Sequence, residues 1–286
     1  MQSRSPAGRE SASPLAPPAA SSSGRLSRLA RSGNPRSTNH EPDRSSGMTA
    51  PVFHLIIPGL PKSANVFIQR TMQLTLGCTF VRFVSSEPSR NILPDKFDEF
   101  FALHRAVGGE HFPPNEHNLR LLAAHDVRKI AVLVRDPRDA VISWWRHLER
   151  SDIKAGHRSE PSYFYDLSPE EKLRDLIVRR LPDYQTRVAT WLDVADTSPT
   201  LECYINRFET FAADQRGALR TMLAFFGHDI DPVLPDIDDA RDAGIDPKTH
   251  FRRGRVGSYR DEAPPELVRL FDERLDRGLA VRMGWT

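Results

Sequence analysis

The sequence of 286 residues contains little cysteine, no long apolar run and almost no net charge. Its two cysteines, Cys78 and Cys203, have no neighbour at the spacing of a metal or redox motif, so we expect no metal site and reduced thiols in the cytoplasm. No segment approaches the roughly 18 apolar residues of a membrane span. The formal net charge of +2 gives no reason to expect nucleic acid as a partner, so any anion site must come from individually placed residues.

The N-terminal segment, residues 1–47, lacks hydrophobic periodicity because it consists mainly of Ser, Pro, Ala, Gly and Arg. Such a composition buries too little apolar surface to offset the entropy that is lost on ordering. We therefore expect a disordered segment at residues 1–47, followed by one domain at residues 48–286. Two alternatives stay open: the segment resembles an organelle transit peptide, or Met48 is the true first residue.

After Pro51, segments with strand character alternate with segments of helical periodicity. Strands are expected at residues 52–59, 79–86, 130–134 and 200–209, and helices at residues 65–77, 115–126, 139–150, 168–195, 214–227 and 263–277. Residues 95–104 are amphipathic and their type stays open, and the longest helical segment has an expected break near Pro182. This alternation predicts an α/β fold with a central parallel sheet flanked by helices.

The stretch IIPGLPKSANVF, residues 56–67, joins the first expected strand to the first expected helix. In a parallel sheet, ligands lie at the carboxyl ends of the strands, where a helix N-terminus offers backbone N–H groups to an anion. Lys62 adds positive charge, and Ser63 and Asn65 add donors. The stretch is not a Walker A loop, because Gly59 lies three positions before Lys62 and no Gly directly precedes the Lys. The alternative is an ordinary turn with a surface lysine.

Two later stretches combine arginine with hydroxyl or small residues. In VLVRDPRDAVISWW, residues 132–145, Arg135 ends a strand and Ser143 lies on the following helix, with Asp139 as the expected helix cap. An arginine and a hydroxyl that converge on one anion form a phosphate clamp. In HFRRGRVGSYRDE, residues 250–262, arginines lie among glycines that let the backbone bend around a ligand. Each stretch alone is also compatible with solvated surface charges.

Taken together, PKSANVF, VRDPRDAVISWW and RRGRVGSY resemble the three nucleotide-binding segments of sulfotransferases that use 3'-phosphoadenylyl sulfate (PAPS). The resemblance runs from Phe53 to Tyr259 and implies a P-loop-like, nucleotide-binding sulfotransferase fold. It implies that the first segment holds the 5'-phosphosulfate, that Arg135 and Ser143 hold the 3'-phosphate, and that Phe208 flanks the adenine. The residues implied to bind PAPS are Pro61, Lys62, Ser63, Ala64, Asn65, Val66, Phe67, Arg135, Ser143, Phe208, Arg252, Arg253 and Gly254.

Several positions depart from the family pattern. Ala64 stands where the family has Gly, which leaves less room near the phosphates. Val66 replaces a hydroxyl residue, so only its backbone N–H remains for the 5'-phosphate, and Phe67 replaces the Trp that packs on adenine. Two alternatives therefore stay open: a sulfotransferase-like protein that binds the nucleotide without catalysis, and a P-loop-like nucleotide-dependent phosphotransferase.

The resemblance also implies catalytic roles. Sulfuryl transfer is an in-line displacement in which negative charge builds on the leaving oxygen. Lys62 is expected to stabilise that oxygen, with Ser143 close to it. The family carries a His before the middle segment as the general base, so His111 in GEHFPP is the first candidate and His104 is the second.

The acceptor is expected to be a small molecule that carries a hydroxyl or amine. Aromatic residues at positions 163–165 favour an aromatic or lipidic acceptor. PAPS is the expected sulfate donor, without a metal ion. The sequence does not predict an oligomeric state.

Overall fold

The computed structural model describes residues 52–86, 89–155, 159–235 and 255–285. The segment expected to be disordered, residues 1–47, lies outside these ranges, as do Arg252, Arg253 and Gly254. None of the helices described is both long and apolar enough to cross a bilayer.

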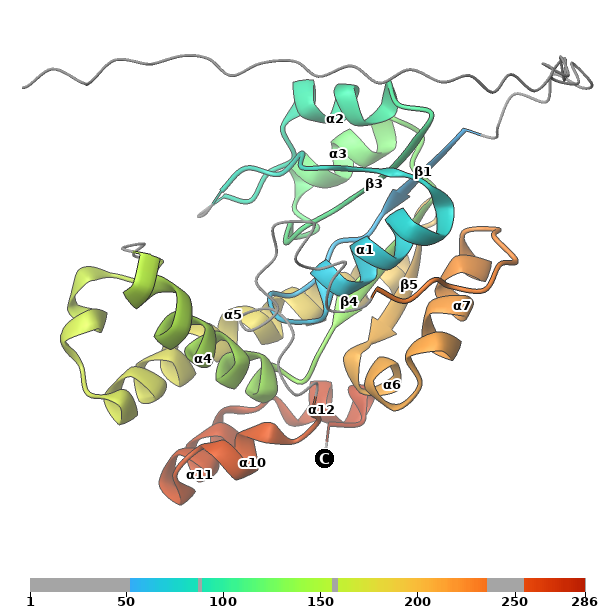
Figure 1. Cartoon of the computed structure of the whole chain (residues 1–286). Helices are drawn as coiled ribbons and strands as arrows, with labels where there is room; N and C mark the ends of the chain where they lie inside the picture. Colours follow the sequence, from blue (N-terminus) through green and yellow to red (C-terminus); the bar gives the residue numbers. More distant parts are fainter. Residues whose placement is uncertain (1–51, 87–88, 156–158, 236–254, 286) are drawn as a thin grey trace, which may run out of the picture. The chain divides into compact units, whose positions relative to one another are not determined.

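Parallel strands form the centre of the fold (Figure 1). Strand β3 lies between β1 and β2, and β4 pairs with β5. A parallel bridge between Gly59 and Leu133 joins the two groups, and the N–H of Leu60 donates to the carbonyl of Leu133 at 2.9 Å. The strand order is therefore β2-β3-β1-β4-β5, with all carboxyl ends at one edge. The strands are β1 (Phe53–Ile56), β2 (Thr79–Val81), β3 (Arg105–Gly108), β4 (Lys129–Val134) and β5 (Glu202–Arg207).

Helices connect the strands, and further helices follow the last described strand, β5. The N-terminus of α5 is fixed by a capping box, in which Ser168 and Glu171 satisfy each other's backbone N–H groups. The α-helices are α1 (Asn65–Leu76), α2 (Pro94–Phe101), α3 (Glu116–Ala124), α4 (Pro137–Ala155), α5 (Pro169–Thr197), α6 (Phe208–Ala213), α7 (Gln215–Phe225), α10 (Ser258–Glu262), α11 (Pro265–Arg274) and α12 (Arg277–Met283). A 3₁₀ turn spans Ser162–Asp166.

The sheet buries both of its faces, because successive strand residues point to opposite sides. Leu133 and its neighbours on one face pack against α1, α6 and α7, through residues such as Met72 and Leu219. Val132 and its neighbours on the other face pack against α4, α5 and α11, through residues such as Leu176. This arrangement confirms the predicted α/β class with a parallel sheet flanked by helices.

Several details differ from the sequence prediction; for example, the strand expected at residues 79–86 spans only Thr79–Val81. Helix α5 continues through Pro182 without a break, since buried side chains on both sides, including Leu181 and Tyr184, hold it against the core. Strand β3 was not expected, because its four residues, RAVG, are too short to show a period. Residues 95–104, whose type was open, form most of α2.

Candidate nucleotide-binding and active site

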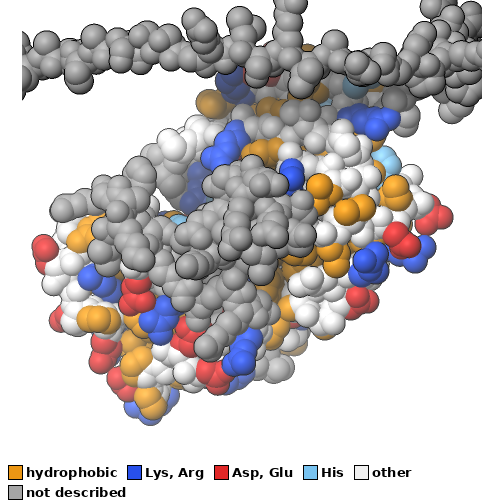
Figure 2. Space-filling model, in the orientation of Figure 1, with side chains coloured by type: hydrophobic (Ala, Val, Ile, Leu, Met, Phe, Trp, Pro, Cys, Tyr) orange, Lys and Arg blue, Asp and Glu red, His pale blue; other side chains and the backbone are white. Residues whose placement is uncertain are grey.

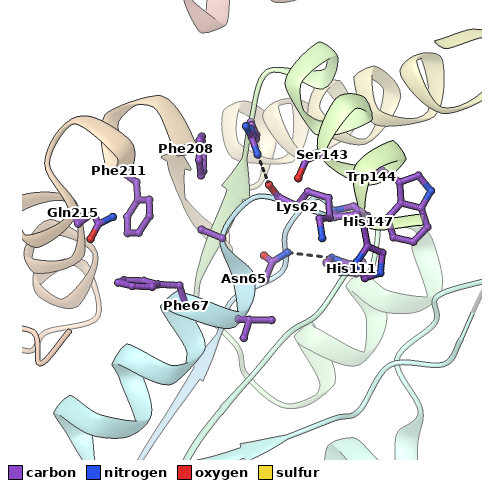
Figure 3. A pocket seen from close by; sticks show the side chains of 14 residues that line it. Lys62, Asn65, Phe67, His111, Ser143, Trp144, His147, Phe208, Phe211 and Gln215 are labelled. Atoms are coloured by element: carbon purple, nitrogen blue, oxygen red, sulfur yellow. Dashed lines mark hydrogen bonds between the residues drawn. The ribbon is translucent and has the colours of Figure 1, made fainter. Parts of the chain in front are cut away.

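A cleft of about 320 Å³ lies at the carboxyl edge of the sheet, and its volume is that of a small-molecule pocket. It collects residues that follow different strands: Lys62 follows β1, His111 follows β3, Arg135 follows β4 and Phe208 follows β5. Figure 3 shows Lys62, His111, Trp144 and His147 at one end, and Phe67, Phe211 and Gln215 at the other. The lining residues are Pro61, Lys62, Ala64, Asn65, Val66, Phe67, His111, Arg135, Ser143, Trp144, His147, Phe208, Phe211 and Gln215.

The loop at residues 61–64 is shaped to present backbone donors. Lys62 and Ala64 both adopt left-handed backbone conformations, with φ of 68° at each. Ala64 occupies the N-cap of the 12-residue helix α1 and makes no side-chain cap, so the first N–H groups of α1 are not satisfied by a cap. Such a terminus, with its positive dipole end, suits a phosphate or sulfate. For an alanine, the left-handed conformation costs about 1–2 kcal/mol.

The side chains of Ser63 and Asn65 differ in their hydrogen bonding. The Ser63 side chain is buried, and its Oγ has no hydrogen-bond partner among the described residues, which suits a donor to a bound anion. The Asn65 amide instead donates to the carbonyl of Leu60 at 2.7 Å. A side chain at Gly59 would place Cβ 2.4 Å from Asn65 Oδ1, so only glycine allows this approach.

Arg135 links several parts of the site. Arg135 is 6% exposed, and its guanidinium donates to the carbonyls of Lys62 and Arg255, each at 3.0 Å. It also lies over the ring of Phe208, 4.1 Å from the ring centre. Phe208 therefore presents one ring face to Arg135. Ser143 lies on α4 and lines the same cleft.

Asp139 does not act as the cap of its own helix, which begins at Pro137. Its fully buried carboxylate accepts hydrogen bonds from Gly257 N–H at 2.7 Å, and from Ser258 Oγ and Tyr259 N–H at 3.0 Å each. Burial raises the pKa of Asp139, and the nearby Arg135 opposes the shift. Asp139 thus fixes the start of α10, a contact between segments far apart in the sequence that the motif did not reveal.

His111 has a defined tautomer. Its Nδ1 lies 2.8 Å from the carbonyl oxygen of Gly59, which can only accept, so Nδ1 carries the proton and Nε2 keeps its lone pair. The 3.4 Å contact between Nδ1 and the Asn65 amide is secondary. Burial lowers the pKa of His111 from 6.5 to about 4, and the positive charges of Arg90, Arg187 and Lys62 add to the shift, while the bond to Gly59 opposes it. His111 is therefore neutral near neutral pH.

His104, the second candidate base, lies elsewhere. It is exposed and precedes β3 at the amino end of the strand, whereas the cleft lies at the carboxyl end. His104 does not follow the end of a strand, because strand β3 begins at Arg105. The structure does not bring His104 to the other candidate residues.

Sequence reasoning missed Trp144, His147, Phe211 and Gln215 as lining residues. Helical spacing held part of the signal: His147 follows Ser143 by four positions on α4, and Phe211 follows Phe208 by three on α6. The ring of Phe211 meets that of Phe67 edge-on, with centroids 5.5 Å apart.

The positive charge of the cleft comes from single residues, Lys62 and Arg135, that line it. In Figure 2, acidic and basic side chains of the described residues lie beside one another at the lower left of the face shown. Among the residues that the structure describes, no Asp or Glu lines the cleft. The described part of the chain also contains no group of three or more His, Cys, Asp or Glu side chains that could hold a metal ion.

Comparisons with known proteins bear on the fold. No protein-family model and no curated protein matches the chain. Among solved structures, the chain is similar to mouse sulfotransferase SULT7A1 complexed with PAP, with 16% identity and a TM-score of 0.54 over 77% of this chain and 81% of that one. It is also similar to retinol dehydratase in complex with retinol and PAP, with 14% identity and a TM-score of 0.50 over 79% and 81%. The same enzyme in complex with androsterone and PAP gives 14% identity and a TM-score of 0.51 over 79% and 80%. The chain therefore has the sulfotransferase fold that the three sequence motifs predicted.

Proposed function

We propose that this protein transfers a sulfuryl group from PAPS to a hydroxyl or amine of a small-molecule acceptor. The observation that carries the proposal is the convergence of the Lys62 loop, Arg135 and Ser143 on one cleft at the N-terminus of α1. Solved structures of the same fold contain PAP, which we take to be 3',5'-adenosine bisphosphate, the product nucleotide.

In this proposal, the loop and the first N–H groups of α1 hold the 5'-phosphosulfate, while Arg135 and Ser143 hold the 3'-phosphate. Phe67 and Phe211, whose rings meet in the cleft, flank the adenine, and Phe208 offers the side of its ring away from Arg135. The buried hydroxyl of Ser63 supports the fit, because a phosphate oxygen would satisfy it. Arg252, Arg253 and Gly254 stay part of the proposal, and the contact from Arg135 to the carbonyl of Arg255 supports it.

Two residues carry the chemistry. The donor, when bound, supplies the sulfuryl group and a bisphosphate that leaves as the S–O bond breaks. His111 Nε2 accepts the proton of the acceptor hydroxyl while the acceptor oxygen attacks sulfur. The ammonium of Lys62 stabilises the charge that develops on the leaving oxygen, an interaction that is strongest in the transition state. Figure 3 shows Lys62 beside His111, as the two roles require.

The described residues of the cleft fit an ATP-dependent phosphotransferase less well than a sulfotransferase. Such enzymes hold Mg²⁺ with carboxylates near the phosphates, and no carboxylate is among the described residues that line the cleft. The two thiols, Cys78 and Cys203, are free, which supports a location in the reducing cytoplasm.

The test is transfer of labelled sulfate from PAPS to a panel of phenols, alcohols and amines by the purified full chain in EDTA. We expect labelled product and an equal amount of PAP. Binding of PAP without transfer to any acceptor would favour the non-catalytic alternative. Transfer from ATP that requires Mg²⁺ would instead establish the phosphotransferase.

A further inference from the structure

We propose that Trp144 is the surface on which the ring of an aromatic acceptor lies, and that Glu160 is a positioning residue that fixes the indole there. The inference rests on the proposed function, since it concerns the acceptor end of the same cleft. Neither residue belongs to the set that the nucleotide motifs predicted.

The position of Trp144 follows from the two ends of the cleft. Phe67, Phe211 and Gln215 line the end given to the adenine, whereas Trp144 and His147 lie at the end with Lys62 and His111 (Figure 3). An acceptor whose hydroxyl reaches His111 Nε2 must therefore place its body near the indole. The rings of Trp144 and His147 lie 5.2 Å apart and are inclined by 34°, so the imidazole packs against the indole at this end of the cleft.

Glu160 holds the indole of Trp144 through a network of hydrogen bonds. The Trp144 Nε1–H donates to Glu160 Oε1 at 2.8 Å. Arg180 donates to the same oxygen at 2.8 Å, and Arg179 donates to the other oxygen at 3.0 Å. The Glu160 side chain is fully buried, and its backbone N–H donates to the Tyr165 hydroxyl at 3.1 Å. Charge-assisted bonds of this kind define orientation strongly, so the indole is held in one position.

The residues at the Trp144 end of the cleft favour an acceptor whose hydroxyl is carried by an aromatic ring. A fixed indole stacks on planar rings, and none of the described lining residues is a carboxylate that would attract a cationic amine. Because the pKa of His111 is lowered to about 4, this imidazole is a weak base. A phenol, with a pKa of about 10 like that of tyrosine, gives up its proton to such a base more readily than an aliphatic alcohol.

A matched pair of acceptors tests the inference: 4-methylphenol and 4-methylcyclohexanol, which share size but not aromaticity. We expect wild-type protein to prefer the phenol in kcat/KM, and Trp144→Leu to reduce this preference by about tenfold, the upper range for an aromatic pair. Comparing each variant with wild type cancels the intrinsic reactivities of the two acceptors. PAP affinity should not change in Trp144→Leu.

A double-mutant cycle tests the role of Glu160. Trp144→Phe keeps a ring but removes the N–H, and Glu160→Gln removes the charge from the partner. If Glu160 acts through the indole, both single variants lower the phenol preference, and the double variant is no worse than either one. Asp175→Asn is the control, because Asp175 binds Arg179 but not Trp144; it should keep the preference.

Calorimetric titration of 4-methylphenol, with and without saturating PAP, gives a readout that needs no turnover. We expect binding that weakens about tenfold in Trp144→Leu. Equal affinity in wild type and Trp144→Leu, or additive effects in the cycle, would overturn the inference even if sulfuryl transfer holds. Failure of the proposed function appears separately, as loss of PAP binding or transfer while the phenol still binds at Trp144.

Discussion

Arg135 Nη1 donates a hydrogen bond to the carbonyl oxygen of Lys62 at 3.0 Å. This bond ties the residue after β4 to the backbone of the loop after β1, so the guanidinium proposed to bind the 3'-phosphate is anchored to the loop that carries Lys62. The same guanidinium reaches the carbonyl of Arg255, which brings the start of the C-terminal helices to the site.

The buried carboxylate of Asp139 is expected to stabilise this arrangement strongly. Asp139→Ala removes the acceptor of three donors at the start of α10 and the carboxylate that lies 3.9 Å from Arg135. We expect the free energy of unfolding to fall by about 3 kcal/mol in urea titrations. Asp214→Ala is the matched control, because Asp214 caps α7 at an exposed site and its loss costs about 1 kcal/mol. Equal losses for the two variants would show that Asp139 is an ordinary cap.

Ala64→Gly is expected to stabilise the protein. The left-handed φ of 68° at Ala64 costs about 1–2 kcal/mol for alanine, while glycine loses about 0.4–1 kcal/mol more entropy on folding. The net gain should be about 0.5–1 kcal/mol in the free energy of unfolding. Ala102→Gly, at φ −70°, should instead destabilise by a similar amount. If both variants destabilise equally, Ala64 is not strained.

The alternation of apolar strands and amphipathic helices was sufficient to predict the α/β class. Strand β3 escaped detection because four residues carry no period, and α5 passed through Pro182 because tertiary packing outweighed the local preference. Local sequence signals predict element types, whereas packing decides where short strands form and where a long helix ends.

Part of the candidate site could also be predicted from the sequence. Lys62, His111 and Arg135 follow strands at one edge, and the structure brings them together with Ser143, which lies on the helix after β4. The contact between Asp139 and α10 joins positions 118 to 120 residues apart, and the bond from Trp144 to Glu160 joins a helix to a loop. Such contacts depend on the fold and leave no local pattern.

The pH dependence of the reaction should report His111. Only the unprotonated imidazole can accept a proton, so kcat/KM for the donor should rise with pH through the pKa of His111 and stay level above it. Since burial lowers this pKa to about 4, the rise is expected there and not near 6.5. A midpoint near 6.5 would contradict the buried, neutral base.

Matched substitutions at the two histidines distinguish the catalytic base from a histidine that takes no part in catalysis. His111→Asn keeps a donor for the Gly59 carbonyl but removes the base, and should lower kcat by about 10²–10⁴-fold. His104→Asn changes an exposed residue outside the cleft and should leave kcat unchanged.

Lys62→Met should lower turnover far more than nucleotide affinity. Methionine keeps most of the stem length and removes the charge that stabilises the leaving oxygen, so we expect kcat to fall by about 10²-fold or more. The Kd of PAP should change little, because backbone N–H groups and Arg135 remain. Lys96→Met, on the exposed surface of α2, is the control. Loss of PAP binding in proportion to rate would assign Lys62 to binding alone.

The most direct measurement is a calorimetric titration of the full chain with PAP and with 5'-adenosine monophosphate, in EDTA, for wild type and Arg135→Ala. The two ligands differ only in the 3'-phosphate, which Arg135 and Ser143 are proposed to bind. We expect wild type to prefer PAP by at least about tenfold and Arg135→Ala to lose most of this preference, since a charge-assisted contact contributes about 1.5–3 kcal/mol. Equal affinity of wild type for the two nucleotides, or no binding of PAP, would contradict the assignment of this cleft to PAPS.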